Sequence, residues 1–362
     1  MKLRESKQTS GIALVIVMIS VAVLAILAGG FAYSMKVETR LARNANNESE
    51  LEWLGRSGVE YARWILSEQS RIGAEPYDAL NQVWAGGPGG IGTTNSALLG
   101  VQKEVKLGNG SFTWKILDLD RKANINTASE VVLQQALMLM GASPGDSTPI
   151  VSSILDWIDV DDNTHMQGAE KAFYQTFHYS PKNGPIGDLS ELLLVNAVTP
   201  EIYWGITATN HPPAAFQVRQ GRLSPMAQMA QAQAQGPAFT SGFVDLFTPI
   251  SGGKININTA SADVLQLIPG LDRTMADAIV SGRQGDDDGS GLVGPYRNVQ
   301  EVRRIPEVNL GTGGMLAQYC DVRSRAFEVQ VDARIGNYTR QFVAILGRNN
   351  PRDVQILSFY WK

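Results

Sequence analysis

The sequence offers little for disulfide formation and none of the commonest catalytic motifs. Its 362 residues include a single cysteine, Cys320, so no disulfide can form within the chain. Only three histidines occur, without an H-E-x-x-H pair, and neither a G-x-S-x-G elbow nor a G-x-x-x-x-G-K-[ST] loop is present. We therefore predict that the chain is not an enzyme.

The sequence also lacks a large excess of charge of either sign. The 31 basic and 35 acidic side chains give a formal net charge of -4, whereas binding to nucleic acid requires several cations that neutralise phosphates. No nucleic-acid partner is expected on this ground. The length, with 44% hydrophobic residues, is sufficient for two or more domains.

One long hydrophobic run stands at the N-terminus. The 25 residues from 11 to 35 carry no charge, and about 20 apolar residues suffice for a helix to cross a bilayer. Lys2, Arg4 and Lys7 precede the run against one acid, Glu5. The positive-inside rule then predicts a cytoplasmic N-terminus and an extracytoplasmic remainder.

Three interpretations of this run compete: a cleaved signal peptide, a plain signal anchor, and a prepilin leader that is cut before the apolar run. Ala28 and Gly30 are spaced like a signal-peptidase site, which would place the mature start near Phe31. However, no proline occurs from Ile12 to Ser70, and a helix of that length would extend about 90 Å. A signal peptide has no such helical continuation, so the sequence favours the prepilin leader.

The short basic leader, Gly11 and the aliphatic helix resemble the type IV prepilin family. In that family a peptidase cleaves after the leader glycine, which implies Ile12 as the mature terminus, and a glutamate usually stands fifth. Here the fifth residue is Ile16. This departure resembles the K-type minor pseudopilin of type II secretion, which lacks that glutamate and is placed at the pseudopilus tip. Ile16 could also be only a lipid-facing aliphatic residue.

Alternating segments after the helix predict one antiparallel sheet with a large helical insertion. Two strands meet at the turn 108–110, three more lie near the C-terminus, and helical spacing dominates between them. The predicted fold class is α+β, with a pilin-like long helix packed on the sheet. The expected strands are 101–107, 111–119, 327–335, 340–348 and 354–362. The expected parts are the leader 1–11, the helix 12–70, the first part of the body 71–120, the insertion 121–319 and the closing strands 320–362.

The insertion contains an internal repeat. The sequence NINTAS occurs at 124–129 and again at 256–261, and a second pair of similar segments around Leu189 and Val299 follows at an offset of 110. We predict two related lobes joined by a Gln- and Ala-rich linker at 219–236.

The second copy continues into a segment that resembles a helix-hairpin-helix motif, which suggests an alternative function. A membrane-anchored DNA receptor could use the hairpin at 269–272, where glycine N–H groups would approach phosphate. In this chain Asp272 stands at the second glycine position, with Asp263 and Asp277 nearby. These charges would repel phosphate, so a structural role is favoured.

The segment 156–173 is acidic and supplies the oxygen donors that calcium requires. With Asp159 as position 1 of an EF-hand loop, Thr164 occupies the position of the usual glycine, so a calcium site of another geometry and a solvated acidic turn both remain open. The positions that fit are Asp159, Asp161, Asn163, the carbonyl of His165, Gln167 and Glu170. The K-type resemblance implies calcium in this helical domain, with Asp162 and Asp188 as further ligands.

The resemblance to the K-type minor pseudopilin implies a protein that is not an enzyme and that caps or initiates a periplasmic pseudopilus. It implies a single-pass inner-membrane protein of a Gram-negative-type envelope, with its bulk in the periplasm. The implied partners are the other minor pseudopilins and the pseudopilus, the inner-membrane secretion platform, the prepilin peptidase, and the secretin or secreted proteins.

Overall fold

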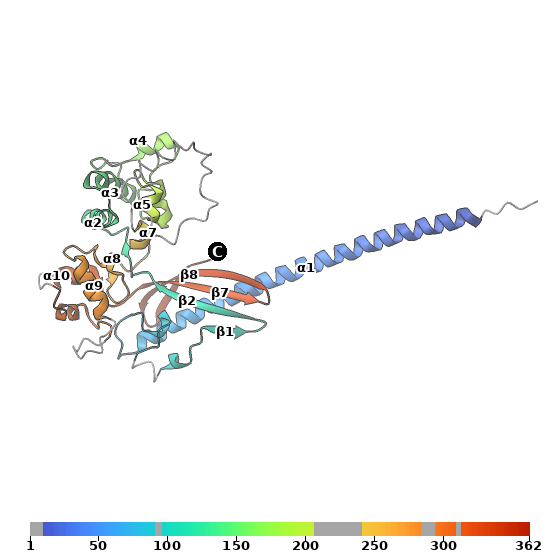
Figure 1. Ribbon diagram of the computed structural model, residues 1–362, viewed down its shortest axis with the longest axis horizontal. Helices are drawn as coiled ribbons and strands as arrows, with labels where there is room; N and C mark the ends of the chain where they lie inside the picture. Colours follow the sequence, from blue (N-terminus) through green and yellow to red (C-terminus); the bar gives the residue numbers. More distant parts are fainter. Residues whose placement is uncertain (1–9, 91–95, 206–240, 284–293, 309–312) are drawn as a thin grey trace, which may run out of the picture.

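A computed structural model describes residues 10–90, 96–205, 241–283, 294–308 and 313–362 (Figure 1). The chain forms a long helix, α1, a five-stranded sheet packed on the second half of that helix, and a mainly helical insertion. The insertion lies at the end of the sheet opposite to the projecting half of α1 (Figure 1). The predicted α+β pilin-like class with an inserted helical domain is confirmed.

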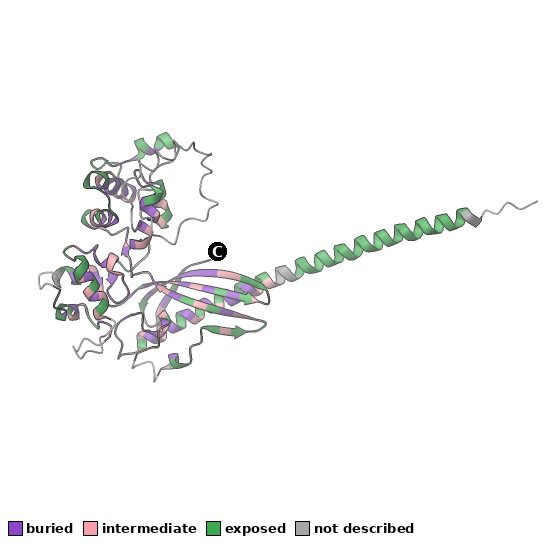
Figure 2. Cartoon of the chain, in the orientation of Figure 1, coloured by how far each residue is buried: buried purple, intermediate pink, exposed green. Residues whose placement is uncertain are grey.

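The helix α1 (Ser10–Arg71) confirms the predicted long helix at 12–70. Its first half is exposed along its whole length, whereas its second half buries one face against the sheet (Figure 2). Among the described residues, this is the one helix that is long and apolar enough to cross a membrane, with a mean hydropathy of 3.0 in its most apolar window. Residues 1–9 of the predicted leader lie outside the described residues, so cleavage between Gly11 and Ile12 stays a prediction.

The five predicted strands form one antiparallel sheet in the order β1-β2-β7-β8-β9. The insertion leaves the sheet after Asp118 and returns at Ala326, because β2 and β7 are neighbours with Asp118 opposite Phe327. The strands are β1 (Glu104–Leu107), β2 (Gly110–Asp118), β7 (Ala326–Ile335), β8 (Tyr338–Asn350) and β9 (Asp353–Trp361).

Two glycines allow α1 to approach the sheet closely. A Cβ atom at Gly55 would lie 2.4 Å from the ring of Phe342, and one at Gly58 would lie 2.4 Å from Val331 and 3.1 Å from Phe112. Both positions therefore exclude a side chain, and the helix backbone packs directly on the apolar face of the sheet.

We expect Gly58→Leu to destabilise the full chain by roughly 3 kcal/mol or more, because four carbons must fit where a single Cβ already collides. Denaturant unfolding of the chain in detergent measures the loss. Gly73→Leu is the matched control, since a Cβ there meets nothing within 4 Å. Equal stability of the two variants would contradict the close packing.

The insertion contains short helices and short parallel strand pairs. The two parallel pairs, β3 with β4 and β5 with β6, were not predicted from the sequence. The helices are α2 (Glu130–Met140), α3 (Pro144–Ile158), α4 (Lys171–Tyr174), α5 (Pro200–Trp204), α7 (Phe243–Leu246), α8 (Ala262–Leu265), α9 (Arg273–Gly282) and α10 (Gly313–Tyr319). The 3-10 helices are η4 (Gln175–Phe177), η5 (Leu189–Leu194) and η7 (Val299–Arg304) in the insertion, and η1 (Val83–Ala85) and η3 (Ala97–Gly100) before it. The short strands are β3 (Ala123–Asn124), β4 (Phe247–Thr248), β5 (Ile255–Asn256) and β6 (Cys320–Asp321).

The second asparagine of each NINTAS copy makes the same pair of backbone hydrogen bonds. The amide of Asn126 donates to the carbonyl of Ile186 at 2.9 Å, and its oxygen accepts from the N–H of Ile186 at 2.7 Å. Asn258 makes the same pair of bonds with Tyr296, both at 2.9 Å. Each asparagine thus holds the chain just before η5 or η7, so the two copies have equivalent structural roles.

The two lobes share one hydrophobic core that continues from α2 and α3 to α8 and α9. The predicted linker at 219–236 lies outside the described residues. The predicted restart of the body at residue 320 differs from the structure, where β6 pairs with β5 of the insertion and the sheet resumes at Ala326.

Candidate metal centre

Ligand-type atoms of Asp156, Asp159 and His165 lie within 4.8 Å of one another at the loop that follows α3. Asp156 lies in the last turn of α3, Asp159 caps its C-terminal end, Glu170 precedes α4, and Asn183 belongs to the next loop. Asp156 and Glu170 are buried, with relative exposures of 0% and 4%. Asn183 is tied to the loop because its amide donates to the carbonyl of Asp161 at 2.9 Å and to Asp162 Oδ1 at 3.1 Å.

These four side chains hold oxygens that have no hydrogen-bond partner although they are buried. Among the described residues, they supply five of the eight buried side-chain nitrogen and oxygen atoms that lack one. The five are Asp156 Oδ2, Asp159 Oδ1, Glu170 Oε1, Glu170 Oε2 and Asn183 Oδ1. Leaving a buried acceptor unpaired costs about 1–3 kcal/mol, more for a charged group. Asp156 and Asp159 belong to a group of side chains that could hold a cation, and Glu170 lies close enough for both charges to act on it.

The loop backbone leaves room for these oxygens. A Cβ at Gly168 would lie 2.0 Å from Asp156 Oδ2, so no side chain is possible there without displacing the carboxylate. Gln167, just before it, has a left-handed backbone with φ of 65°. Ser152 holds the loop by donating to the carbonyl of Met166 at 3.0 Å.

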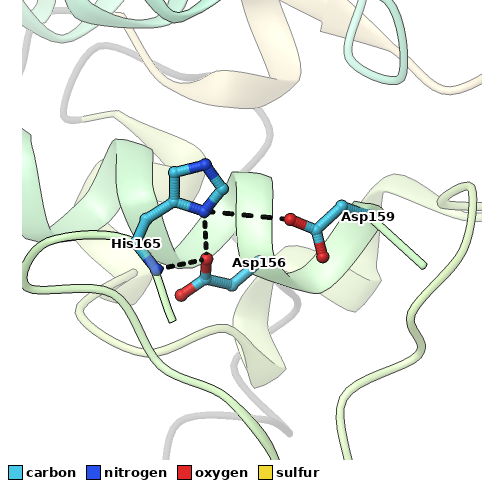
Figure 3. A group of neighbouring side chains, drawn as sticks. All are labelled: Asp156, Asp159 and His165. Atoms are coloured by element: carbon cyan, nitrogen blue, oxygen red, sulfur yellow. Dashed lines mark hydrogen bonds and ion pairs between the residues drawn. The ribbon is translucent and has the colours of Figure 1, made fainter. Parts of the chain in front are cut away.

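His165 contacts the centre with both its backbone and its ring. Its N–H donates to Asp156 Oδ1 at 3.0 Å, and its Nδ1 lies in contact with the same oxygen and 3.8 Å from Asp159 Oδ2 (Figure 3). The neighbouring carboxylate of Asp156 raises the pKa of His165 above its ordinary value. The imidazole therefore occupies one oxygen of Asp156 and leaves the other, Oδ2, unpaired.

Burial and crowding of like charges act together on the carboxylates. Burial raises the pKa of Glu170, and the charges of Asp156 and Asp159 raise it further. Burial also raises the pKa of Asp159, with additional contributions from Asp161 and Asp156. A divalent cation would reverse this repulsion, and a set of carboxylate and amide oxygens is the donor chemistry of calcium.

The structure brings together only part of the predicted ligand set. Asp159 and Glu170 lie in the centre as predicted, while Asp161, Asp162 and Asn163 are exposed at its rim. Asp161 Oδ1 accepts from the N–H of Asn163 at 2.8 Å. The unpaired oxygens therefore do not follow the EF-hand spacing.

Asp188, which the resemblance implied as a further ligand, caps η5 in the structure. Its Oδ1 accepts from the N–H of Ser190 at 2.8 Å and from its hydroxyl at 2.7 Å, which makes Asp188 the N-cap of η5. Because the carboxylate completes a capping box with Glu191, it is used within its own turn.

Sequence reasoning missed Asp156 and Asn183. Asp156 precedes Asp159 by three residues, and this spacing places both carboxylates on one side of the final helical turn. That signal was present in the sequence, whereas Asn183 joins the centre only through the path of the chain after η4.

A second buried polar cluster joins the insertion to the sheet. Asp118 at the end of β2 accepts hydrogen bonds from Asn256 at 3.2 Å, Ser324 at 2.6 Å and the hydroxyl of Thr259. Burial, followed by the nearby charge of Asp120, raises the pKa of Asp118 to about 7. The second NINTAS copy is thereby fixed to the end of the pilin-like body.

This pKa gives a prediction for stability. The folded pKa of Asp118 lies above the unfolded value of about 3.9, so between these values the folded state binds more protons. The stabilisation from this group is complete below about pH 4 and is lost as pH rises through about 7, by up to about 1.4 kcal/mol per pH unit. Denaturant unfolding from pH 5 to pH 8 should show a decline that is smaller in Asp118→Asn. Parallel pH profiles of the two proteins would contradict the assignment.

The hairpin of the second lobe does not offer a phosphate site. Asp272 caps α9 by accepting from the N–H of Met275 at 2.8 Å, which occupies the helix end that phosphate would approach. Arg273 is already paired with Asp277 at 2.9 Å and Asp263 at 2.6 Å. The geometry therefore counts against the DNA-receptor alternative.

Comparisons with known proteins agree with this architecture. The family described as "Type II secretion system (T2SS), protein K" matches residues 114–207, which include β2 and the candidate metal centre. A helix-hairpin-helix motif matches residues 251–311. A chain of the crystal structure of the GspK-GspI-GspJ complex from enterotoxigenic Escherichia coli has a similar fold, with a TM-score of 0.60 at 16% identity, covering 89% of this chain and 99% of that one.

Two curated proteins are similar in sequence. The type II secretion system protein K of Pseudomonas aeruginosa is 22% identical over 356 residues, which are 96% of this chain and 92% of that protein. A putative type II secretion system protein K of Escherichia coli K12 is 24% identical over 215 residues, or 55% of this chain. The alignment spans 61% of the length of the Escherichia coli protein.

The fold gives the class first: a pilin-like body on a long apolar N-terminal helix, interrupted by a helical insertion. Within this class the chain is similar to type II secretion system protein K. Among the described residues, α1 is the one helix that is long and apolar enough to serve as a single-pass membrane anchor.

Proposed function

We propose that this chain stands at the tip of a type II secretion pseudopilus, where it starts or caps the fibre. The position of the insertion carries the proposal. It leaves the sheet after Asp118 and rejoins it at Ala326, at the end away from the anchor. A subunit stacked on that end would collide with the insertion, whereas at a tip nothing lies above it (Figure 1).

Ile16 supports the same position. A glutamate in the apolar helix costs about 2.5–3.5 kcal/mol to insert and is useful only when a neighbour neutralises it. A subunit that begins the fibre has no earlier neighbour that could neutralise such a glutamate. The body and insertion would lie in the periplasm and the N-terminus in the cytoplasm, in agreement with Lys2, Arg4 and Lys7.

The proposed role is structural and not enzymatic. Its partners would be the other minor pseudopilins, because the similar fold was solved as a GspK-GspI-GspJ complex. Further contacts would be the inner-membrane platform, the prepilin peptidase, and the secretin or secreted proteins. Folded proteins would leave the periplasm through the secretin with help from the fibre.

Calcium is the cation that we propose for the centre. Asp156, Asp159, Glu170 and Asn183 would hold it, since their unpaired oxygens are hard donors of the type that calcium prefers. The ion would neutralise the crowded carboxylates and fasten the loop after α3, in a chain whose one cysteine cannot supply a disulfide.

Gold labelling of the insertion on isolated fibres tests the tip position. We expect one label at one fibre end, and we expect deletion of the chain to abolish fibre initiation and secretion. Labels repeated along the shaft, or normal fibres without the chain, would refute the role. Terminal sequencing of the mature protein tests the leader, with Ile12 expected and a start near Phe31 contradicting it.

A further inference from the structure

The end of the sheet that faces the anchor gathers three segments. They are the β1–β2 turn at 106–110, the β7–β8 turn at 334–340 and the end of β9 at 360–362, and together we call them the sheet base. Strand register brings them together, because Ser111 and Thr339 both lie opposite Arg334. The base also touches α1 just after the projecting half, since Arg340 pairs with Glu48 at 2.8 Å.

The three segments of the sheet base carry the basic side chains Lys106, Arg334, Arg340 and Lys362 and no acidic side chain. Two acids of α1 adjoin them, since Glu48 pairs with Arg340 and Glu50 accepts from Asn109 at 3.4 Å. The chain as a whole carries a formal charge of -4. The cations are therefore concentrated at the end of the body nearest the membrane anchor, although the net charge has the opposite sign.

Exposed aromatic and aliphatic side chains accompany these cations. Trp361 is 63% exposed, Tyr338 and Tyr360 are each 44% exposed, and Leu107 is 49% exposed. The guanidinium of Arg340 lies 4.7 Å from the ring centroid of Trp361. Tryptophan, tyrosine and basic residues are the types enriched where proteins meet lipid headgroups.

The anchor sets how far the base lies from the bilayer. The uncharged run ends at Met35, and the 13 residues to Glu48 extend α1 by about 20 Å. The headgroup layer occupies roughly 5–8 Å of this distance. An upright helix would leave the base little more than one Debye length, about 8–10 Å, above the headgroups.

A tilt narrows the remaining gap. Transmembrane helices are tilted by about 20° on average, and the sheet lies along one side of α1 (Figure 1). Tilting towards the sheet brings the hairpin turns closer to the headgroups, within the range of electrostatic attraction. We propose that the sheet base binds the anionic lipid surface of the membrane in which α1 is anchored, so that the unassembled protein rests against the bilayer.

This proposal depends on the anchor and not on the tip position or on calcium. It gives the isolated subunit a defined orientation before assembly. Entry into a fibre would then require the base to leave the lipid surface, and its failure would leave the proposed secretion role untouched.

A fluorescent probe tests the contact in the full chain. Asn337→Cys places the probe on the exposed β7–β8 turn, and Arg352→Cys places it at the other end of the sheet. The native Cys320 is buried, and burial raises its pKa to about 12, so the protein without an added cysteine is the labelling control. Quenching by headgroup-labelled lipid is compared in phosphatidylcholine vesicles with and without about 30% phosphatidylglycerol.

We expect quenching at 337 to be at least about two-fold greater in the anionic vesicles, and to fall to the neutral level at about 0.5 M salt. The probe at 352 should not respond. Lys106→Gln, Arg334→Gln and Lys362→Gln together should abolish the response at 337. Arg63→Gln, Arg71→Gln and Arg352→Gln remove the same charge near the other end and should leave it intact.

Equal quenching at 337 in both vesicles would overturn the proposal. An equal loss of quenching at 337 in the two triple variants would also overturn it, because the response would then depend only on the net charge of the protein. If the probe at 337 is shielded only when other pseudopilins are added, the sheet base is a protein interface. That result would also overturn lipid binding.

Discussion

Arg348→Met should lower the free energy of unfolding by about 3–5 kcal/mol, the cost typical of breaking a buried ion pair by removing one partner. The guanidinium of Arg348 in β8 pairs with Asp78, and both side chains are at most 5% exposed. It also donates to Ser70 at the end of α1 at 2.8 Å and to the carbonyl of Ser324 at 2.7 Å. The substitution leaves the carboxylate of Asp78 buried without a cation.

Thermal unfolding of the full chain in detergent measures this effect, and we expect the apparent melting temperature to fall by roughly 4–7 °C. Arg273→Met is the control, because Arg273 also pairs with two carboxylates but its side chain is 60% exposed. Exposed pairs contribute about 0–1 kcal/mol. If both variants melt near the wild-type temperature, the junction between sheet and insertion does not depend on this pair.

The sequence was sufficient to predict the helix and the five strands. Hydrophobic periodicity reports which face of an element is buried, and the elements of the body are long enough for that signal to be read. The turn Gly108-Asn109-Gly110 also identified the first hairpin, in which Leu107 lies opposite Gly110.

The short strands of the insertion could not be predicted in this way. Each of β3, β4, β5 and β6 has two residues, which is too short for a period of two to be recognised. Their pairing depends on contacts between distant parts of the chain, such as Ile255 with Cys320. The NINTAS repeat marked where these contacts begin, but it did not indicate which segments pair with the repeat.

The candidate metal centre could also be predicted only in part, because some of its contacts join separate parts of the chain. Spacing along the chain identified Asp159 and Glu170, but an EF-hand pattern assumes a single continuous loop. The structure instead brings a helical carboxylate, Asp156, and the imidazole of His165 beside Asp159. Asp188 was chosen by resemblance, and its use as a helix cap appears only when its partners in η5 are known.

Removal of calcium should lower the stability of the full chain by about 2.7 kcal/mol when the ion is present at 100 times its dissociation constant. The reason is that the unpaired oxygens of Asp156, Asp159 and Glu170 would again face one another without a cation. We expect a chelator to lower the apparent melting temperature of the wild type by roughly 3–5 °C. Re-addition of calcium should restore it, whereas magnesium should restore less because it demands a smaller octahedral site.

Two variants separate the centre from its surroundings. Glu170→Gln removes a charged donor that is 4% exposed, and its melting temperature should no longer depend on calcium. Asp188→Asn should retain the full dependence, because asparagine caps a helix about as well as aspartate and Asp188 is engaged in η5. A wild type that melts at the same temperature with calcium and with chelator would refute the site. Loss of the response in Asp188→Asn would instead restore Asp188 to the ligand set.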